Sequence, residues 1–340
     1  MKKHISVIIL AMVLAVAMLF TTACGGATGG VDADGNVSLK VGTGGPTGTY
    51  FAYTNAVGTT LKSVTGYAFD VLSTGGSVAN INGIADGDYT MAIVQNDTMI
   101  KAFNDLDKEN FKTGAIKDFS VIGQVYSEVV QIVVRGDLKD KVKSLADLKG
   151  MRVSVGDAGS GVYNNAKTLF ESYDMTLEDI QENNLSVGDS ANAMKDGQLD
   201  AFFFTAGVPT TAITELATSM DVFMLSLGDD VIADFIANNK LDGKYEVYSK
   251  QPITHENYDF IPENEPAYTI GVTATFIMSN EVSEEVAYNV TKALWENKEQ
   301  IAKGHVVGTS MNVKNAVLTI GNIPVHPGAA KYYKEVGVMK

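Results

Sequence analysis

Three glycine-rich turns, each between a strand-like run and a helix-like run, constrain the fold of this chain more than any other feature. They lie at residues 42–51 (GTGGPTGTYF), 73–77 (STGGS) and 156–161 (GDAGSG). A helix that starts directly after such a turn has N–H groups in its first turn without intrahelical partners. These N–H groups can bind a small anion. Three such turns therefore predict a protein that holds a small acid.

Short β-rich runs alternate with helical runs, which predicts an α/β fold. Near the N-terminus, strands are expected at 37–41, 68–72 and 89–94, and helices at 51–64 and 78–86. This order implies a parallel sheet with right-handed crossovers. The glycine-rich turns then lie at the carboxyl ends of the strands, where open α/β sheets bind ligands.

A long β-rich run at 121–134 separates this unit from a second α/β unit and is expected to cross between two lobes. Further strands are predicted at 151–155, 201–204, 221–227 and 268–278, and helices at 163–173, 207–220 and 284–298, with a short one ending at 334. Two units with glycine-rich turns at their strand ends predict two lobes that face a ligand cleft.

The N-terminal segment has the pattern of an export signal. Lys2 and Lys3 precede an apolar run at 5–20, and small residues lead to Cys24, the only cysteine. We expect a signal peptide at 1–23, a lipid-anchored Cys24 and a flexible tether at 24–36, and hence an extracytoplasmic protein at the cell membrane. Thr21 departs from the usual lipobox leucine, so an ordinary secretory signal is the alternative. A transmembrane anchor is weaker, since the run is short for a span.

The charge balance narrows the class of partner. The chain has 26 basic and 40 acidic residues, a formal net charge of −14. Such an acidic body argues against nucleic acid and anionic lipid as partners. Arginine occurs only at Arg135 and Arg152 and in none of the turns. A bidentate guanidinium clamp on the ligand is therefore not expected.

A dinucleotide site is the main alternative for the first turn. Gly42 and Gly44 begin a GxGxxG pattern, but Thr47 takes the place of its third glycine and Pro46 lacks an N–H. A tight turn without a ligand would need glycine alone, whereas Thr43, Thr47, Thr49 and Tyr50 add hydroxyls. Binding of a small acid is favoured over both alternatives.

No constellation of catalytic or metal-binding residues is visible. His255, His305 and His326 are isolated, and the sequence has no HExxH motif and no cysteine pair. The turn at 156–161 lacks two of the glycines of a GxSxG nucleophile elbow and ends before Val162. We therefore expect no enzyme, no metal and no cofactor.

Seven segments carry a resemblance to a known family. They are GTGGPTGTYF (42–51), STGGSVANI (73–81), MAIVQND (91–97), QVYSEVVQIVVR (124–135), MRVSVGDAGSG (151–161), DGQLDAFFFTAGVPTTAI (196–213) and VHPGAAKYYKE (325–335). With these segments in order along nearly the whole mature chain, the protein resembles the TAXI-type substrate-binding proteins of tripartite ATP-independent periplasmic (TRAP) transporters. Val162 departs from the family, which often has a hydroxyl residue there.

The resemblance implies a two-lobed, type II periplasmic-binding-protein fold. It places residues 37–128 and 279–340 in lobe 1 and residues 129–278 in lobe 2. It further implies a monomer that binds a small organic acid, such as a glutamate-like amino acid or a dicarboxylate, and delivers it to membrane-embedded TRAP permease subunits. A sensory ligand-presenting domain or an extracytoplasmic enzyme on the same fold is the alternative.

The candidate ligand-binding residues come from the turns and from the strand ends. We expect main-chain N–H groups and the hydroxyls of Thr43, Thr47, Ser73 and Ser77 to hold the carboxylate, although Ser77 is also placed to cap a helix. Polar residues at 95–97 either face the cleft or start an ordinary loop. The full candidate set is Thr43, Gly44, Gly45, Thr47, Tyr50, Ser73, Gly75, Gly76, Ser77, Gln95, Asp97, Ser160, Tyr163, Phe204, Ala206 and Pro209. Tyr50, Gln95, Asp97, Tyr163 and Phe204 would set specificity, and Asp97 would favour a ligand with an amino group.

Overall fold

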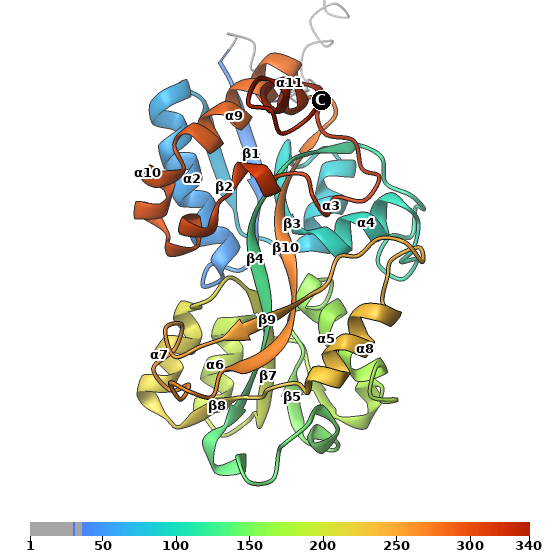
Figure 1. Cartoon of the computed structure of the whole chain (residues 1–340), viewed down its shortest axis with the longest axis vertical. Helices are drawn as coiled ribbons and strands as arrows, with labels where there is room; N and C mark the ends of the chain where they lie inside the picture. The colour runs from blue at the N-terminus through green and yellow to red at the C-terminus, as the bar shows by residue number, and fades with distance from the viewer. Residues whose placement is uncertain (1–29, 31–35) are drawn as a thin grey trace, which may run out of the picture.

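The structure is a computed structural model that describes residue 30 and residues 36–340. The predicted signal peptide, Cys24 and the tether as far as residue 35, residue 30 excepted, lie outside the described residues. Figure 1 shows two lobes, one above the other, joined by long strands that run through both. Within the described part of the chain, no helix is both long and apolar enough to span a membrane.

The upper lobe begins with the βαβαβ order that the sequence predicts. Its first elements are β1 (Ser38–Gly42), α2 (Thr49–Thr65), β2 (Ala68–Leu72), α3 (Ser77–Ala85), β3 (Met91–Gln95) and α4 (Asn96–Phe103). Strand β1 pairs in parallel with both β2 and β3, which confirms the predicted parallel sheet. The first two glycine-rich turns therefore lie at the carboxyl edge of these strands.

Two long antiparallel strands join the lobes: β4 (Phe119–Arg135) and β10 (Ala267–Ser279). They occupy the centre of the sheet, whose order is β2-β1-β3-β10-β4-β7-β5-β6. Along β10, residues 267–271 pair with β9 and residues 274–278 pair with β3. The lobe boundaries at 128 and 278 stay a prediction, and this pairing favours a crossing in β10 near Val272 and Thr273.

The lower lobe contains the second α/β unit. Its elements are β5 (Arg152–Ser154), α5 (Gly161–Glu171), β6 (Gln181–Asn183), α6 (Val187–Lys195), β7 (Ala201–Ala206), α7 (Thr211–Ser219), β8 (Val222–Met224), α8 (Asp229–Asn238) and β9 (Ser249–Ile253). Strand β5 is parallel to β6 and β7, whereas β7 is antiparallel to β4.

The C-terminal part returns to the upper lobe, where it appears in orange and red in Figure 1. It contains α9 (Glu284–Glu296), α10 (Lys298–Gly304) and α11 (Pro327–Glu335). Short 3-10 turns are η2 (Gly136–Leu138), η3 (Leu145–Leu148), η4 (Leu177–Asp179), η5 (Val306–Ser310) and η6 (Val313–Asn315).

The structure corrects several predicted elements. The helix predicted at 284–298 ends at Glu296, because Asn297 interrupts the helical backbone between α9 and α10. The helical run predicted at 207–220 begins only at Thr211, because Val208 precedes Pro209 and a residue before proline is disfavoured from helical backbone angles. Helices α4, α8 and α10 are among those that were not predicted.

Helix α2 is held against the crossing strand β4 by aromatic packing. The ring of Tyr53 meets the ring of Tyr126 edge-on at 5.0 Å and stacks on Phe276 of β10 at 6.1 Å. All three side chains are buried, and burying a large apolar side chain stabilises a fold by about 1.5–3 kcal/mol. This packing fixes the start of α2, and hence the first glycine-rich turn, relative to the strands that join the lobes.

Candidate functional site

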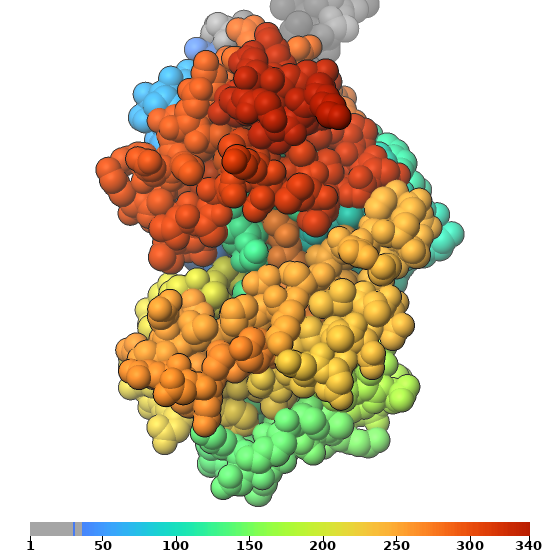
Figure 2. All heavy atoms as spheres, in the orientation of Figure 1, coloured from blue at the N-terminus to red at the C-terminus, as the bar shows by residue number. Residues whose placement is uncertain are grey.

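All three glycine-rich turns line one cavity between the lobes. The cavity has a volume of about 60 Å³. Its lining residues are Gly44, Gly45, Thr47, Gly48, Thr49, Tyr50, Gly75, Gly76, Ser77, Gln95, Glu128, Gly156, Asp157, Ser160, Gly161, Val162, Leu185, Ser186, Val187, Phe204, Thr205 and Ala206. Figure 2 shows the lobes in contact along a furrow, with atoms of the joining strands at its floor.

Four helices begin at this cavity. The residues that precede α2 and α3 are Gly48 and Gly76, and neither helix has a side-chain cap. The first N–H groups of both helices are therefore left without a side-chain acceptor, and the positive end of each helix dipole lies at the cavity. Helices α5 and α6 are capped by Ser160 and Ser186, whose hydroxyls accept from Tyr163 N and Asp189 N.

Most of the candidate residues lie around the cavity. From the upper lobe these are Gly44, Gly45, Thr47, Tyr50, Gly75, Gly76, Ser77 and Gln95, and from the lower lobe Ser160, Phe204 and Ala206. Their positions are compatible with ligand contact, which stays a prediction. The turns supply both main-chain N–H groups and hydroxyls, as the proposed binding of an acid requires.

The other candidates lie elsewhere. The Thr43 hydroxyl donates to the Leu72 carbonyl at 2.6 Å and ties β1 to β2. Ser73 is exposed and outside the cavity lining. Tyr163 follows the α5 cap and packs against the core, and Pro209 lines a neighbouring hollow.

Asp97 is the fifth candidate residue outside the cavity lining, and it is fully buried beside the cavity. Its Oδ1 accepts from Thr98 N at 2.7 Å. Its Oδ2 accepts from Asn165 Nδ2 of α5 at 3.0 Å and from the Tyr248 hydroxyl at 3.1 Å. Because Asp97 belongs to the upper lobe and its two side-chain partners to the lower lobe, the carboxylate ties the lobes together.

Glu128 lines the cavity and was not among the candidates. Its side chain is only 1% exposed, and its Oε2 accepts a hydrogen bond from the Tyr50 hydroxyl at 2.7 Å. Burial raises the pKa of Glu128 to about 8, with Asp97 adding to the shift and the Tyr50 hydrogen bond opposing it. The available signal was a carboxylate in the middle of a strand that is otherwise almost wholly buried.

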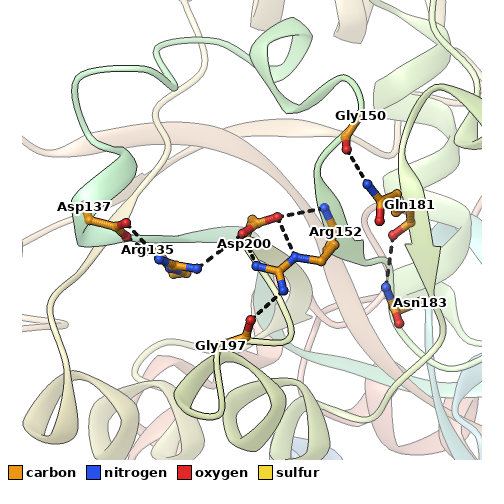
Figure 3. Close-up of polar contacts among 8 residues, drawn as sticks. All are labelled: Arg135, Asp137, Gly150, Arg152, Gln181, Asn183, Gly197 and Asp200. Carbon is orange, nitrogen blue, oxygen red and sulfur yellow. Dashed lines mark hydrogen bonds and ion pairs between the residues drawn. The ribbon is translucent and has the colours of Figure 1, made fainter.

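Both arginines take part in an ion-pair network outside the cavity lining. Figure 3 shows Asp200 between the guanidinium groups of Arg135 and Arg152. Asp200 Oδ1 lies 2.6 Å from Arg152 Nη2 and 3.4 Å from Arg135 Nη1, and Arg135 also pairs with Asp137 at 2.8 Å. These contacts lower the pKa of Asp200, chiefly through the Arg152 hydrogen bond.

Among residues 30 and 36–340, those that line the cavity include no lysine, arginine or histidine. An anion held there would rely on main-chain N–H groups, hydroxyls and helix dipoles. The same part of the chain contains no cluster of three or more metal-binding side chains.

The lobes approach closely on both sides of the cavity. A Cβ atom added to Gly161 of α5 would overlap the side-chain amide of Gln95 in the upper lobe. One added to Gly188 of α6 would lie 2.8 Å from Thr47 Oγ1. A side chain at either position would force its neighbour to shift, so these two glycines favour the close approach of the lobes.

Comparison with known families agrees with this geometry. The sequence profile of the NMT1-like family matches residues 41–337, nearly the whole described chain. The chain belongs to the NMT1-like family. This family assignment is coarser than the resemblance described above, and it covers both lobes and the whole cavity.

Three solved structures align with most of this chain. A binding protein component of an ABC phosphonate transporter from Pseudomonas aeruginosa aligns with a TM-score of 0.52 at 13% identity, covering 81% of this chain and 79% of that one. A protein from Bordetella bronchiseptica RB50 aligns with a TM-score of 0.51 at 13% identity, covering 89% of each chain. The alkanesulfonate-binding protein SsuA from Xanthomonas axonopodis pv. citri, bound to MOPS, gives 0.46 at 14% identity over 89% and 84%.

The NMT1-like protein therefore has the α/β fold of a type II periplasmic binding protein, with two lobes and a cavity between them. The fold class expected from the sequence is confirmed.

Proposed function

We propose that this protein is an extracytoplasmic solute-binding lipoprotein that captures a small carboxylate and delivers it to a TRAP permease by lobe closure. The observation that carries the proposal is the set of uncapped helix starts around a cavity that, in the described part of the chain, has no basic side chain in its lining. Free N–H groups at a helix N-terminus favour an anion without the need for a counter-ion.

The ligand carboxylate would be held from the upper lobe first. Helices α2 and α3 present the N–H groups of their first turns, and the hydroxyls of Thr49 and Ser77 lie in the same lining. Contacts from α5 and α6 of the lower lobe then complete the site when the lobes close, which excludes water and strengthens each polar contact.

Two arguments support the finer parts of the proposal. The TRAP partner rests on the resemblance of seven sequence segments to TAXI-type proteins. The carboxylate rests on the hydroxyl-rich first turn and on the small cavity. The solved relatives are described as sulfonate, phosphonate and amino-acid binders, so other oxyanions belong in the same test.

A binding screen with matched variants tests the carboxylate. Thr49→Val removes a cavity-lining hydroxyl at nearly constant side-chain volume. Thr59→Val makes the same substitution at an exposed position of the same helix, away from the cavity lining. A panel of carboxylates, sulfonates and phosphonates would be screened by thermal shift and followed by calorimetry. We expect a carboxylate to bind about tenfold more weakly to Thr49→Val and unchanged to Thr59→Val. Binding of sulfonates or phosphonates alone would contradict the proposal.

The partner is tested by transport. Vesicles that contain the TRAP permease subunits should accumulate the bound carboxylate when this protein and an ion gradient are supplied, and should not require ATP. Native mass spectrometry of the freshly purified protein would identify a retained ligand for this assay. Turnover of that ligand by the protein alone would favour the alternative of an enzyme.

A further inference from the structure

We infer that Glu128 pairs with a cationic amine of the ligand and gives up its proton to solvent when the ligand binds. This inference rests on the proposed function, since it assigns the second functional group of the same small carboxylate. It selects an ammonium-bearing acid over a dicarboxylate or a hydroxy acid.

The charges around the cavity favour a ligand with both an anionic and a cationic group. The lining contains two carboxyl side chains, Glu128 and Asp157, and no basic side chain within residues 30 and 36–340. A purely anionic ligand would lie beside Asp157 and would leave Glu128 without a charged partner. A zwitterion can instead place its carboxylate at the helix starts and its ammonium at Glu128, so that each charge meets its complement.

Hydrogen-bond acceptors without a partner in the cavity lining favour an ammonium group on the ligand. Among the described residues, the Glu128 side chain has one hydrogen bond, which Oε2 accepts from Tyr50, so Oε1 can carry the proton of the neutral acid and can accept from an ammonium once that proton has left. Gln95 Oε1 and Thr205 Oγ1 are buried, lack hydrogen-bond partners and belong to lining residues. An ammonium group has three N–H donors and no acceptor, so it suits a wall on which acceptors are left free.

The sheet places two of these groups on one face. Thr205 of β7 is paired with Val130 of β4, which is two residues from Glu128. Residues two apart on a strand point to the same face, and diagonal neighbours on adjacent strands lie within reach of a common small group. Glu128 and Thr205 therefore approach the ligand from the same side of the sheet.

The groups around Glu128 determine whether its carboxyl is protonated. Tyr50 from α2, Tyr126 from β4 and Asp97 from α4 are the titratable groups that interact with it, and Asp157 shares the cavity. Burial raises the pKa of Glu128 to about 8, so the carboxyl is protonated at neutral pH before an ammonium group approaches it. An incoming ammonium favours the carboxylate, and the displaced proton leaves to solvent.

The test compares ligands that differ only in the amine. Each of the common amino acids would be titrated beside its 2-hydroxy analogue, for example L-glutamate beside L-2-hydroxyglutarate. Calorimetry at pH 6.5 in two buffers of different ionisation enthalpy counts the protons. We expect the amino acid to bind at least about 30-fold more tightly, with release of about one proton and an affinity that rises about tenfold per pH unit up to pH 8.

A matched pair of variants measures what the negative charge of Glu128 contributes to ligand affinity and proton release. Glu128→Gln keeps the size and removes the negative charge, and Glu263→Gln makes the same change on an exposed loop. We expect Glu128→Gln to lose at least about 30-fold in affinity for the amino acid and to release no proton, whereas Glu263→Gln behaves as the wild type. If Glu128→Gln does not fold, the proton count of the wild type still decides.

The outcomes separate the two proposals. Equal binding of the amino and hydroxy members of a pair, or uptake of a proton, would overturn the inference and leave the carboxylate proposal standing. If no carboxylate of either kind binds, both fail together. Unchanged amino-acid affinity in Glu128→Gln would also remove Glu128 from the site.

Discussion

The hydroxyl of Tyr50 donates a hydrogen bond of 2.7 Å to the carboxyl of Glu128. These residues are 78 positions apart, one in the first turn of α2 and the other in the strand that joins the lobes. The bond thus connects the turn proposed to hold the anion with a strand that runs through both lobes. Burial and Glu128 together raise the pKa of Tyr50 well above its usual value, so this hydroxyl stays a donor at every physiological pH.

The first prediction concerns stability against pH in the absence of ligand. The pKa of Glu128 is about 8 in the folded protein against 4.5 as the reference value. Between these values the unfolded chain ionises while the folded protein keeps its proton, so the free energy of unfolding falls as pH rises, by at most about 5 kcal/mol. Below pH 4.5 and above pH 8 this contribution is constant.

Glu128→Gln should remove that dependence. We expect the variant and the wild type to differ little at pH 5, and the variant to be more stable at pH 8.5, because Gln has no charge to bury. Urea denaturation at several pH values between 5 and 8.5 measures the difference. Parallel curves for the two proteins would contradict the raised pKa.

The second prediction tests lobe closure at Gly161. The three atoms nearest to a Cβ at this position all belong to the side chain of Gln95, and alanine at the first position of α5 suits the helix itself. Gly161→Ala should therefore leave the open protein stable and hinder closing. A closure penalty of about 1.4 kcal/mol weakens binding tenfold. Calorimetry measures the affinity, and small-angle scattering measures the compaction on binding.

Shortening the opposing side chain provides the control for Gly161→Ala. In the Gln95→Ala background the added methyl group has room, so Gly161→Ala should have little further effect on affinity or compaction. If the methyl group weakens binding equally in both backgrounds, the clash with Gln95 is not the cause.

Much of this fold could be predicted from local sequence patterns. The turns at 42–51, 73–77 and 156–161 specify strand ends and helix starts through glycine and hydroxyl chemistry, and all three line the cavity. Those signals are local, because each turn encodes its own backbone geometry. The parallel order of the first strands followed from the alternation of strands and helices.

The roles of two carboxylates could not be predicted in the same way. Asp97 and Glu128 both follow or interrupt buried apolar runs, so the sequence marks both as unusual. Asp97 turns toward Asn165 and Tyr248, whereas Glu128 faces the cavity. That difference depends on how the lobes meet and on the strand register of β4, which are set by contacts between residues far apart in the chain.

The third prediction separates the arginines from ligand binding. Asp200 accepts hydrogen bonds from the side chain and the main-chain N–H of Arg152 and pairs with Arg135. Asp200→Asn should lower the free energy of unfolding by about 1–3 kcal/mol, since it leaves these donors poorly matched. Ligand affinity should stay unchanged, because neither arginine lines the cavity. A loss of affinity in the folded variant would implicate a guanidinium in the site.

The last prediction concerns the contact at Asp97 that ties the lobes together. Two donors, Asn165 Nδ2 and the Tyr248 hydroxyl, converge on Oδ2. In Asp97→Asn with the amide nitrogen at that position, donor would face donor, and with the amide reversed the Thr98 N–H would lose its acceptor. Either way a buried donor is left unpaired at a cost of about 1–3 kcal/mol. Because the two side-chain donors come from the lower lobe, much of that cost falls on the closed form. We expect ligand affinity to fall about tenfold, although Asp97 is not a lining residue.

Glu109→Gln is the matched control, since Glu109 also pairs across the lobes, with Lys167 at 2.7 Å, but in an exposed position. Exposed ion pairs contribute little, so this variant should bind as the wild type does. Equal effects of the two substitutions would show that any contact between the lobes serves, whereas a selective effect of Asp97→Asn assigns closure to the buried carboxylate.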